Sequence, residues 1–251
     1  MALARTVLPE TLDDLPEDAP AAIRSRRDLQ RVNRVMRARS ILLGAIDRAF
    51  ADRPAPRRIV ELGAGDGSLM LALAQRLAPR WPGVRVSLLD RQRVVDARTL
   101  AAFQRMGWQA DLLQVDALRW SAGAHDTQDT QGAHGASTAD GASDERIDLV
   151  IANLFVHHFD APALAALLRG VAARCDAFVA NEPRRGAVPL AASRLIGLLG
   201  VNAVTRGDAV LSVRAGFRGR ELSAAWPDPA SWRLQEGLAL PFSHCLVATR
   251  A

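Results

Sequence analysis

The chain has 251 residues, of which 49% are hydrophobic and 24% are charged, enough to build one sizeable core. No apolar run approaches the roughly 20 residues of a membrane-spanning helix, and the start lacks the apolar core of a signal peptide, so we expect a cytoplasmic protein without an integral membrane segment. The formal charge of +5 would suggest a nucleic-acid partner, but the arginines are spread along the chain and only 5% of residues are aromatic, so we expect none.

Residues 1–52 predict an N-terminal arm followed by a helical cap. Prolines and acidic residues within 1–19 indicate an extended arm. From 20 to 50, apolar residues recur at helical spacing, and Gly44 or a break near Ser40 is expected to divide this stretch into two helices. Arginines fill most of the remaining face, which leaves open a solvated surface or a contact with an anionic substrate or a membrane surface.

Residues 53–251 predict one domain in which strands and helices alternate. Strands are expected at 58–62, 84–89, 109–115, 147–154 and 177–180, and helices at 68–77, 94–106 and 161–174. This alternation indicates a parallel, doubly wound, Rossmann-like α/β sheet with right-handed crossovers.

Three further segments complete the domain. The polar stretch 121–145 has no apolar periodicity and is predicted to be a disordered surface insertion. Residues 187–225 predict a helical lid, with helices near 190–199 and 208–215. Residues 232–238 and 242–249 predict a C-terminal antiparallel hairpin.

The most informative motif joins the first strand to the helix after it. Residues 59–69 read Ile-Val-Glu-Leu-Gly-Ala-Gly-Asp-Gly-Ser-Leu. Glycine adopts positive φ and has no Cβ, so Gly63, Gly65 and Gly67 allow the backbone to pass directly beneath a ligand. The segment therefore predicts a nucleotide-cofactor loop.

The residues around these glycines argue against a dinucleotide. A dinucleotide loop would carry glycine at the position of Ser68. The carboxylates of Glu61 and Asp66 would repel a pyrophosphate, whereas a cofactor with an amino group and a sulfonium would tolerate or use them.

Polar side chains follow at the ends of successive strands, where open α/β sheets bind their ligands. A carboxylate at Asp90 can accept hydrogen bonds from both ribose hydroxyls, a position shared with NAD enzymes. A carboxylate at Asp116 can accept one from an adenine amino group. Asn153 ends the fourth strand, beneath the expected reacting group.

This set of residues resembles the class I S-adenosylmethionine-dependent methyltransferases, from about residue 57 to 185 and again through the final hairpin. The resemblance implies a seven-stranded sheet and S-adenosylmethionine as the cofactor. The residues that it assigns to the cofactor are Glu61, Gly63, Ala64, Gly65, Gly67, Asp90, Arg91, Asp116, Ala117 and Asn153.

The segment after the fourth strand resembles that of small-molecule methyltransferases of the quinone-methylating type. His157 and His158 are the candidate catalytic residues, because imidazole titrates near neutral pH and can deprotonate or orient a phenol. His157 is the better candidate, although either histidine could instead cap the next helix. Glu182 is a third candidate that could orient the substrate, and the adjacent Arg184 and Arg185 could hold an anionic group or form an exposed ion-pair cluster.

Residue counts limit the remaining chemistry. Lys and Tyr are absent, so neither can act as a catalytic base. The two cysteines, Cys175 and Cys245, have small or apolar neighbours that indicate burial, and we expect no metal site.

These patterns and the resemblance predict an S-adenosylmethionine-dependent methyltransferase, with a homodimer as one arrangement. The resemblance implies that it acts on a hydrophobic aromatic, phenolic or quinone-like small molecule, by O-methylation. The alternatives are an RNA or protein methyltransferase, suggested by the charge, and a non-catalytic module that binds the cofactor. Asn153 is followed by Leu154 and Phe155, so the Pro-Pro-aromatic signature of exocyclic-amine methylation is missing.

Overall fold

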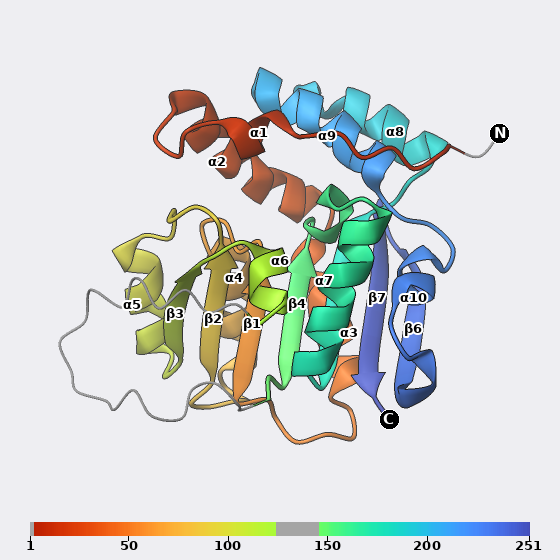
Figure 1. Cartoon of the computed structure of the whole chain (residues 1–251). Helices are drawn as coiled ribbons and strands as arrows, with labels where there is room; N and C mark the ends of the chain where they lie inside the picture. The colour runs from red at the N-terminus through yellow and green to blue at the C-terminus, as the bar shows by residue number, and fades with distance from the viewer. Residues whose placement is uncertain (1–2, 124–145) are drawn as a thin grey trace.

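The computed structural model describes residues 3–123 and 146–251. Within these residues, seven strands form one mixed sheet in the order β3-β2-β1-β4-β5-β7-β6 (Figure 1). Strands β1 to β5 run parallel, and β7 is antiparallel to both β5 and β6. The predicted fold class is confirmed. The strands are β1 Arg58–Leu62, β2 Arg85–Asp90, β3 Gln109–Gln114, β4 Leu149–Asn153, β5 Ala177–Pro183, β6 Trp232–Ala239 and β7 Ser243–Arg250.

Helices cover both faces of the sheet, because successive side chains of a strand point to opposite sides. Ile59 of β1 packs with helices α3 (Ala38–Ala49), α4 (Ser68–Leu77) and α5 (Ala97–Arg105) on one face. Its neighbour Val60 packs with α6 (Ala117–Ser121), α7 (Ala161–Arg174) and α10 (Glu221–Ala225) on the other. Cys245 and Cys175 are buried in these two cores respectively, as predicted.

A third group of elements lies across the carboxyl ends of the parallel strands, and we call it the cap (Figure 1). The cap consists of the arm 3–19, which includes the short helix α1 (Thr11–Asp14), with α2 (Pro20–Val35), α8 (Ala187–Arg194), the 3-10 helix η2 (Ile196–Leu199) and α9 (Ala203–Ala215). Segments from both ends of the sequence therefore meet over the edge where the sequence places its candidate site residues.

The break between the first two long helices differs from the expected one. It lies at Arg37, which adopts a left-handed conformation with φ of 58°, rather than near Ser40 or at Gly44. The reason is that α2 packs against α9 in the cap, whereas α3 packs against β5 and β7 of the sheet, so the chain must turn between them.

The expected lid and the expected insertion also have different boundaries in the structure. The lid expected at 187–225 contributes α8, η2 and α9 to the cap, but α10 packs against α7 and β6. The insertion expected at 121–145 falls outside the described residues from 124 onward, while Ser121 is buried at the end of α6. Among the described helices, none is long and apolar enough to cross a membrane.

Candidate active site

A cavity of about 1000 Å³ lies between the carboxyl ends of the strands and the cap. At one end it is lined by the glycine loop after β1 and by the polar residues after β2 and β3. At the other end it is lined by the arm, by helices of the cap and by both histidines of the segment after β4. The residues predicted to bind the cofactor and the histidines predicted to act in catalysis therefore line the same cavity.

Gly63 and Gly65 of the loop have different structural roles. A Cβ added to Gly63 would lie 2.2 Å from the Phe155 ring, so the absence of a side chain there allows the loop to pack against the segment after β4. A Cβ added to Gly65 would meet nothing within 4 Å, because this residue faces the cavity. The φ angles of Gly63 and Gly65, 68° and 54°, also favour glycine.

The carboxylates after β2 and β3 line the cavity and also hold their own loops. Asp90 accepts hydrogen bonds from the backbone N–H groups of Gly65, at 2.8 Å, and Gln92, at 2.9 Å. Asp116 uses Oδ1 to cap helix α6, accepting from the N–H groups of Leu118 and Arg119. Each carboxylate oxygen has two lone-pair sites, so both residues keep acceptor capacity toward a ligand.

Glu61 is buried, and its Oε2 atom has no hydrogen-bond partner. Burial and, to a smaller extent, the nearby charges of Asp66 and Asp90 raise the pKa of Glu61 well above its usual range. A buried carboxyl group without a partner is costly unless a ligand supplies one. A donor or a positive charge in the cavity would provide that partner.

The remaining residues assigned to the cofactor occupy the same wall in different ways. Asn153 lies in a chain of amides, donating to Asn33 of α2 at 3.0 Å and accepting from Asn181 at 2.8 Å. Ala64 and Ala117 are buried and line the cavity, and the exposed Arg91 lies at its edge. Gly67 begins α4 with φ of 72° and packs against Leu88 and Thr99 rather than facing the cavity.

Glu182 is fully buried beneath the segment after β4 and is absent from the cavity wall. Its Oε1 accepts hydrogen bonds from the N–H groups of Phe155 and Val156, and its Oε2 contacts His157 Nδ1 at 2.7 Å. From the sequence we expect Glu182 to orient the substrate, but in the structure its carboxylate instead binds residues 155–157 and fixes the segment that carries the histidines.

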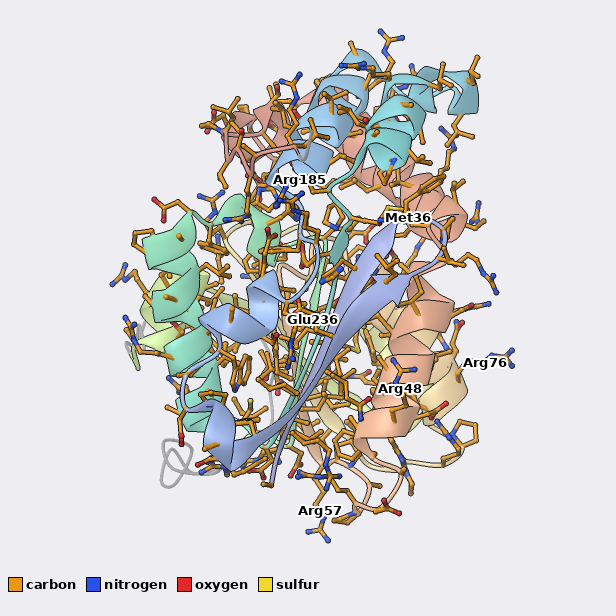
Figure 2. All side chains as sticks on the ribbon, turned by 90° about the vertical axis from the view of Figure 1, so that its right-hand side faces the viewer. Met36, Arg48, Arg57, Arg76, Arg185 and Glu236 are labelled. Atoms are coloured by element: carbon orange, nitrogen blue, oxygen red, sulfur yellow. The ribbon has the colours of Figure 1, made fainter. Side chains whose placement is uncertain are left out.

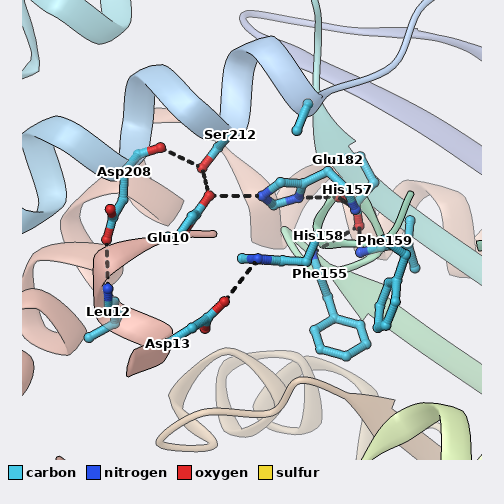
Figure 3. A network of polar contacts seen from close by, with 12 residues as sticks. Glu10, Leu12, Asp13, Phe155, His157, His158, Phe159, Glu182, Asp208 and Ser212 are labelled. Atoms are coloured by element: carbon cyan, nitrogen blue, oxygen red, sulfur yellow. Dashed lines mark hydrogen bonds and ion pairs between the residues drawn. The ribbon is translucent and has the colours of Figure 1, made fainter. Parts of the chain in front are cut away.

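The imidazole of His157 is buried between two carboxylates (Figure 3). Nδ1 faces Glu182, and Nε2 lies 3.3 Å from Oε1 of Glu10. Burial alone would lower the pKa of His157, but the hydrogen bonds and charges of Glu10 and Glu182 outweigh it and raise that pKa to about 9. At neutral pH the ring is therefore a cation with both nitrogens engaged.

His158 has a different environment. Its side chain is 22% exposed and lines the cavity, and its Nδ1 lies 3.2 Å from Oδ2 of Asp13. Burial raises the pKa of Asp13, but the hydrogen bond and charge of His158, together with Arg91, outweigh that effect and hold the pKa below its usual range. The contact orients the ring and leaves Nε2 as the nitrogen for a ligand.

Glu10 and Asp13 both come from the arm, and sequence reasoning missed them. Asp208 of α9 accepts hydrogen bonds from the N–H groups of Thr11 and Leu12, and Ser212 donates to Glu10 (Figure 3). The acidic composition of residues 10–18 was the available signal, but nothing in the local pattern tells which carboxylates meet a histidine almost 150 positions away.

Arg185 anchors the same arm. Its buried guanidinium donates to the carbonyl groups of Leu3 and Gly216 and forms an ion pair with Glu221. Arg5 in turn donates to the carbonyls of His157 and Phe159. The sequence predicts that Arg185 could bind an anionic group. In the structure its guanidinium is instead occupied by contacts within the protein.

Glu10, His157 and His158 each bring one potential metal-ligand atom to within 4.8 Å of the other two. In the described part of the chain, the ion pairs of the two histidines with Glu10 and Asp13 account for this arrangement. The expectation of no metal stays a prediction.

The strand order, the antiparallel β7 and the glycine loop after β1 together define the class I S-adenosylmethionine-dependent methyltransferase fold. No protein-family model matches the chain, and no curated protein matches its sequence. Solved structures do match its fold, at identities low enough that the likeness concerns the fold alone.

Three of these structures illustrate the match. The plantazolicin methyltransferase BamL superposes with a TM-score of 0.60 and 12% identity over 96% of this chain and 93% of its own. The magnesium protoporphyrin IX methyltransferase ChlM from Synechocystis PCC 6803 gives 0.53 and 16%, over 94% and 96%. The mitomycin 7-O-methyltransferase MmcR gives 0.55 and 20% over 96% of this chain, which spans only 60% of MmcR.

Proposed function

We propose that this chain is an S-adenosylmethionine-dependent methyltransferase that O-methylates a hydrophobic aromatic, phenolic or quinone-like small molecule. The observation that carries the proposal is the single cavity that joins the glycine loop, Asp90 and Asp116 to His158. An enzyme of this kind must hold a methyl donor and an acceptor in one water-poor space. Structures of the same fold, named for plantazolicin, mitomycin and a porphyrin, support a small-molecule acceptor.

The residues of this cavity fit the cofactor. Gly65 leaves the loop open where a ligand would pass, and the unpaired Oε2 of Glu61 calls for a donor or a positive charge. Asp90 would hold the ribose hydroxyls and Asp116 the adenine amino group, in line with their remaining acceptor capacity. When bound, the cofactor supplies an electrophilic methyl group on a sulfonium.

His158 is the base in this proposal. Its Nε2 takes the proton of a phenol, and Asp13 at Nδ1 stabilises the imidazolium that results. The bound cofactor would supply the methyl group to the phenolate oxygen, and His158 then releases its proton to solvent. His157 cannot take this role, because at neutral pH it already carries both protons between Glu10 and Glu182.

The acceptor end of the cavity suits an apolar ring. Leu29 and Val32 of α2, Phe159, and Ile196 and Val213 of the cap line it. Such walls bind a flat hydrophobic molecule and leave orientation to a few polar groups. Among the described residues, only two arginines line the cavity, Arg26 and Arg91, which is fewer than the basic groove of a nucleic-acid acceptor site would need.

A calorimetric titration with S-adenosylmethionine and S-adenosylhomocysteine tests the cofactor assignment. We expect both to bind, and Asp90→Ala to weaken binding strongly. Asp111→Ala, which removes an exposed carboxylate from the edge strand β3, serves as the matched control and should bind normally. Failure of the unmodified protein to bind either ligand would exclude an enzyme of this class.

Transfer of a labelled methyl group then separates the acceptor classes. We expect label in extracted lipophilic phenols and none in RNA or in protein. Label in RNA or protein would favour the second candidate activity, and cofactor binding without transfer to any class would favour a non-catalytic module.

A further inference from the structure

The segment from α8 to η2 exposes large apolar side chains at the outer edge of the cap, which we call the apolar rim. Its members Val188, Leu195, Leu198 and Leu199 are 69%, 61%, 85% and 41% exposed. Single exposed leucines are ordinary on a protein surface, but a contiguous apolar group marks a surface that binds something.

The apolar rim is also the border of the cavity. Leu195, Leu198 and Leu199 line the cavity while presenting much of their surface to the outside. These exposed leucines therefore lie where the cavity that contains His158 reaches the outer surface. An apolar molecule that arrives at the rim can reach the acceptor end without leaving an apolar surrounding.

Arginines from three elements surround the rim. Arg24 of α2 donates to the carbonyl of Gly200, Arg194 ends α8, and the side chain of Arg206 lies against Gly197. All three are exposed, and none forms an ion pair with an acidic residue in the described ranges 3–123 and 146–251.

Helix α2 extends this basic surface. Arg27, Arg31 and Arg34 follow Arg24 at spacings of three, seven and ten residues, which places all four on one side of the helix. Of these four, only Arg31 has an acidic partner within the described part of the chain, and that partner is Asp28. The arginine-rich face that the sequence shows in this helix thus borders the apolar rim.

We propose that the apolar rim and its surrounding arginines bind the surface of an anionic lipid bilayer, and that the acceptor enters the cavity from that bilayer. Leucines that enter the boundary between headgroups and acyl chains, with arginines on the lipid phosphates, form the usual arrangement of a protein that lies on a membrane without crossing it. A second copy of the chain fits less well, because a symmetric contact would bring the arginines of both copies together.

The acceptor implied by this arrangement is a phenol that carries an apolar tail and dissolves in the bilayer. This second half of the proposal rests on the proposed methyl transfer. The first half, binding to the bilayer, does not depend on it and can be tested separately.

Flotation of the full chain with vesicles tests the binding. We expect the protein to float with vesicles of phosphatidylcholine and phosphatidylglycerol, to float poorly with phosphatidylcholine alone, and to be released by salt. Leu195→Gln with Leu198→Gln should weaken binding about tenfold or more, because two leucines no longer leave water.

A second pair of variants keeps the test independent of the leucines. Arg24→Gln with Arg206→Gln should also weaken binding to the anionic vesicles. Arg57→Gln with Arg76→Gln removes the same charge from exposed positions outside the cap and should bind as the unmodified protein does (Figure 2). The unfolding temperature of each variant shows whether it is folded.

Absence of flotation with anionic vesicles, or equal loss in the Arg57 and Arg76 control, would overturn the proposal. Association of the lipid-free protein that the leucine variant abolishes, without any vesicle binding, would assign the rim to a protein partner instead. Methyl transfer to an alkylphenol dissolved in the same vesicles tests the acceptor, and we expect faster transfer in the anionic ones. Vesicle binding without cofactor binding would leave the docking surface standing and remove the proposed enzyme.

Discussion

Oε2 of Glu182 lies 2.7 Å from Nδ1 of His157, and both side chains are buried, Glu182 on β5 and His157 in the segment after the neighbouring strand β4. Because of this contact, the two adjacent histidines have different environments and different proposed roles. His157 becomes a fixed cation that joins the arm to the sheet, and His158 is left facing the cavity.

The charged state of His157 should make stability depend on pH. Its pKa of about 9 in the folded chain exceeds the usual value of 6.5, so its contribution is complete below pH 6.5 and is lost as the pH rises through about 9. We expect the free energy of unfolding to fall by on the order of 3 kcal/mol over this range. Urea unfolding at pH 6, 7.5 and 9.5 measures it. His157→Gln should flatten the slope, and an equal slope in that variant would contradict the assignment.

Removing the proposed base should slow turnover without changing cofactor affinity. His158→Ala should lower kcat by about 10²- to 10⁴-fold, the usual contribution of a general base. Asp13→Asn should lower it less, because the ring keeps its nitrogen but loses the carboxylate that orients it. Asp18→Asn, an exposed carboxylate of the same arm, is the control. Unchanged rates in both test variants would move the base elsewhere.

Substitutions at Gly65 and Gly63 should affect different properties, the first cofactor binding and the second stability. Gly65→Val should abolish binding of S-adenosylmethionine in a protein that still folds, because the side chain enters the cavity. Gly63→Ala should instead destabilise the fold, since its Cβ meets Phe155. Gly107 also has a positive φ, 77° against 54° at Gly65, in a turn with open space around it, so Gly107→Val controls for backbone strain. Normal cofactor affinity in the Gly65 variant would refute the loop assignment.

Glu61→Gln should raise stability and lower affinity together. The amide removes the cost of burying an ionisable group whose Oε2 has no partner, so the unfolding free energy of the ligand-free protein should rise by roughly 1 to 3 kcal/mol at pH 7. The amide also cannot ionise when a positively charged cofactor binds, so calorimetry should show weaker binding. A variant that binds as tightly as the original would show that Glu61 has no role toward the ligand.

Metal ions should be unnecessary for methyl transfer. Activity should persist in EDTA, and added Zn²⁺ should inhibit, because it would capture the nitrogens and carboxylate of His157, His158 and Glu10. Activity that EDTA abolishes and Zn²⁺ restores would assign this cluster to a metal instead.

The sheet was predictable because each strand carries its own evidence. A short apolar run between turn residues determines strands such as β1, Arg58–Leu62, almost residue by residue. The position of Asp90 and Asp116 on the cavity wall was predictable for the same reason, since Asp90 is the last residue of β2 and Asp116 lies two residues after β3. Parallel strands bring their carboxyl ends together without further information.

The acceptor end could not be predicted in this way. The partners of His157 and His158 are Glu10 and Asp13, which reach them only because Asp208 and Arg185 fix the arm across the cap. No local pattern encodes such a contact. The burial of Glu182 was hidden as well, because its position near the end of β5 is the same whether its side chain faces the cavity or the segment after β4.

The arm also makes the catalytic end of the molecule separable from its framework. Residues 3–15 contribute no strand to the sheet and none of the buried residues in its two main cores. A proteolytic cut near Leu15 would therefore leave a cofactor-binding body intact while stripping both histidines of their outer carboxylates. We expect such a product to fold and to bind the cofactor but to turn over more slowly, so a fall in methyl transfer would report the loss of residues 3–15.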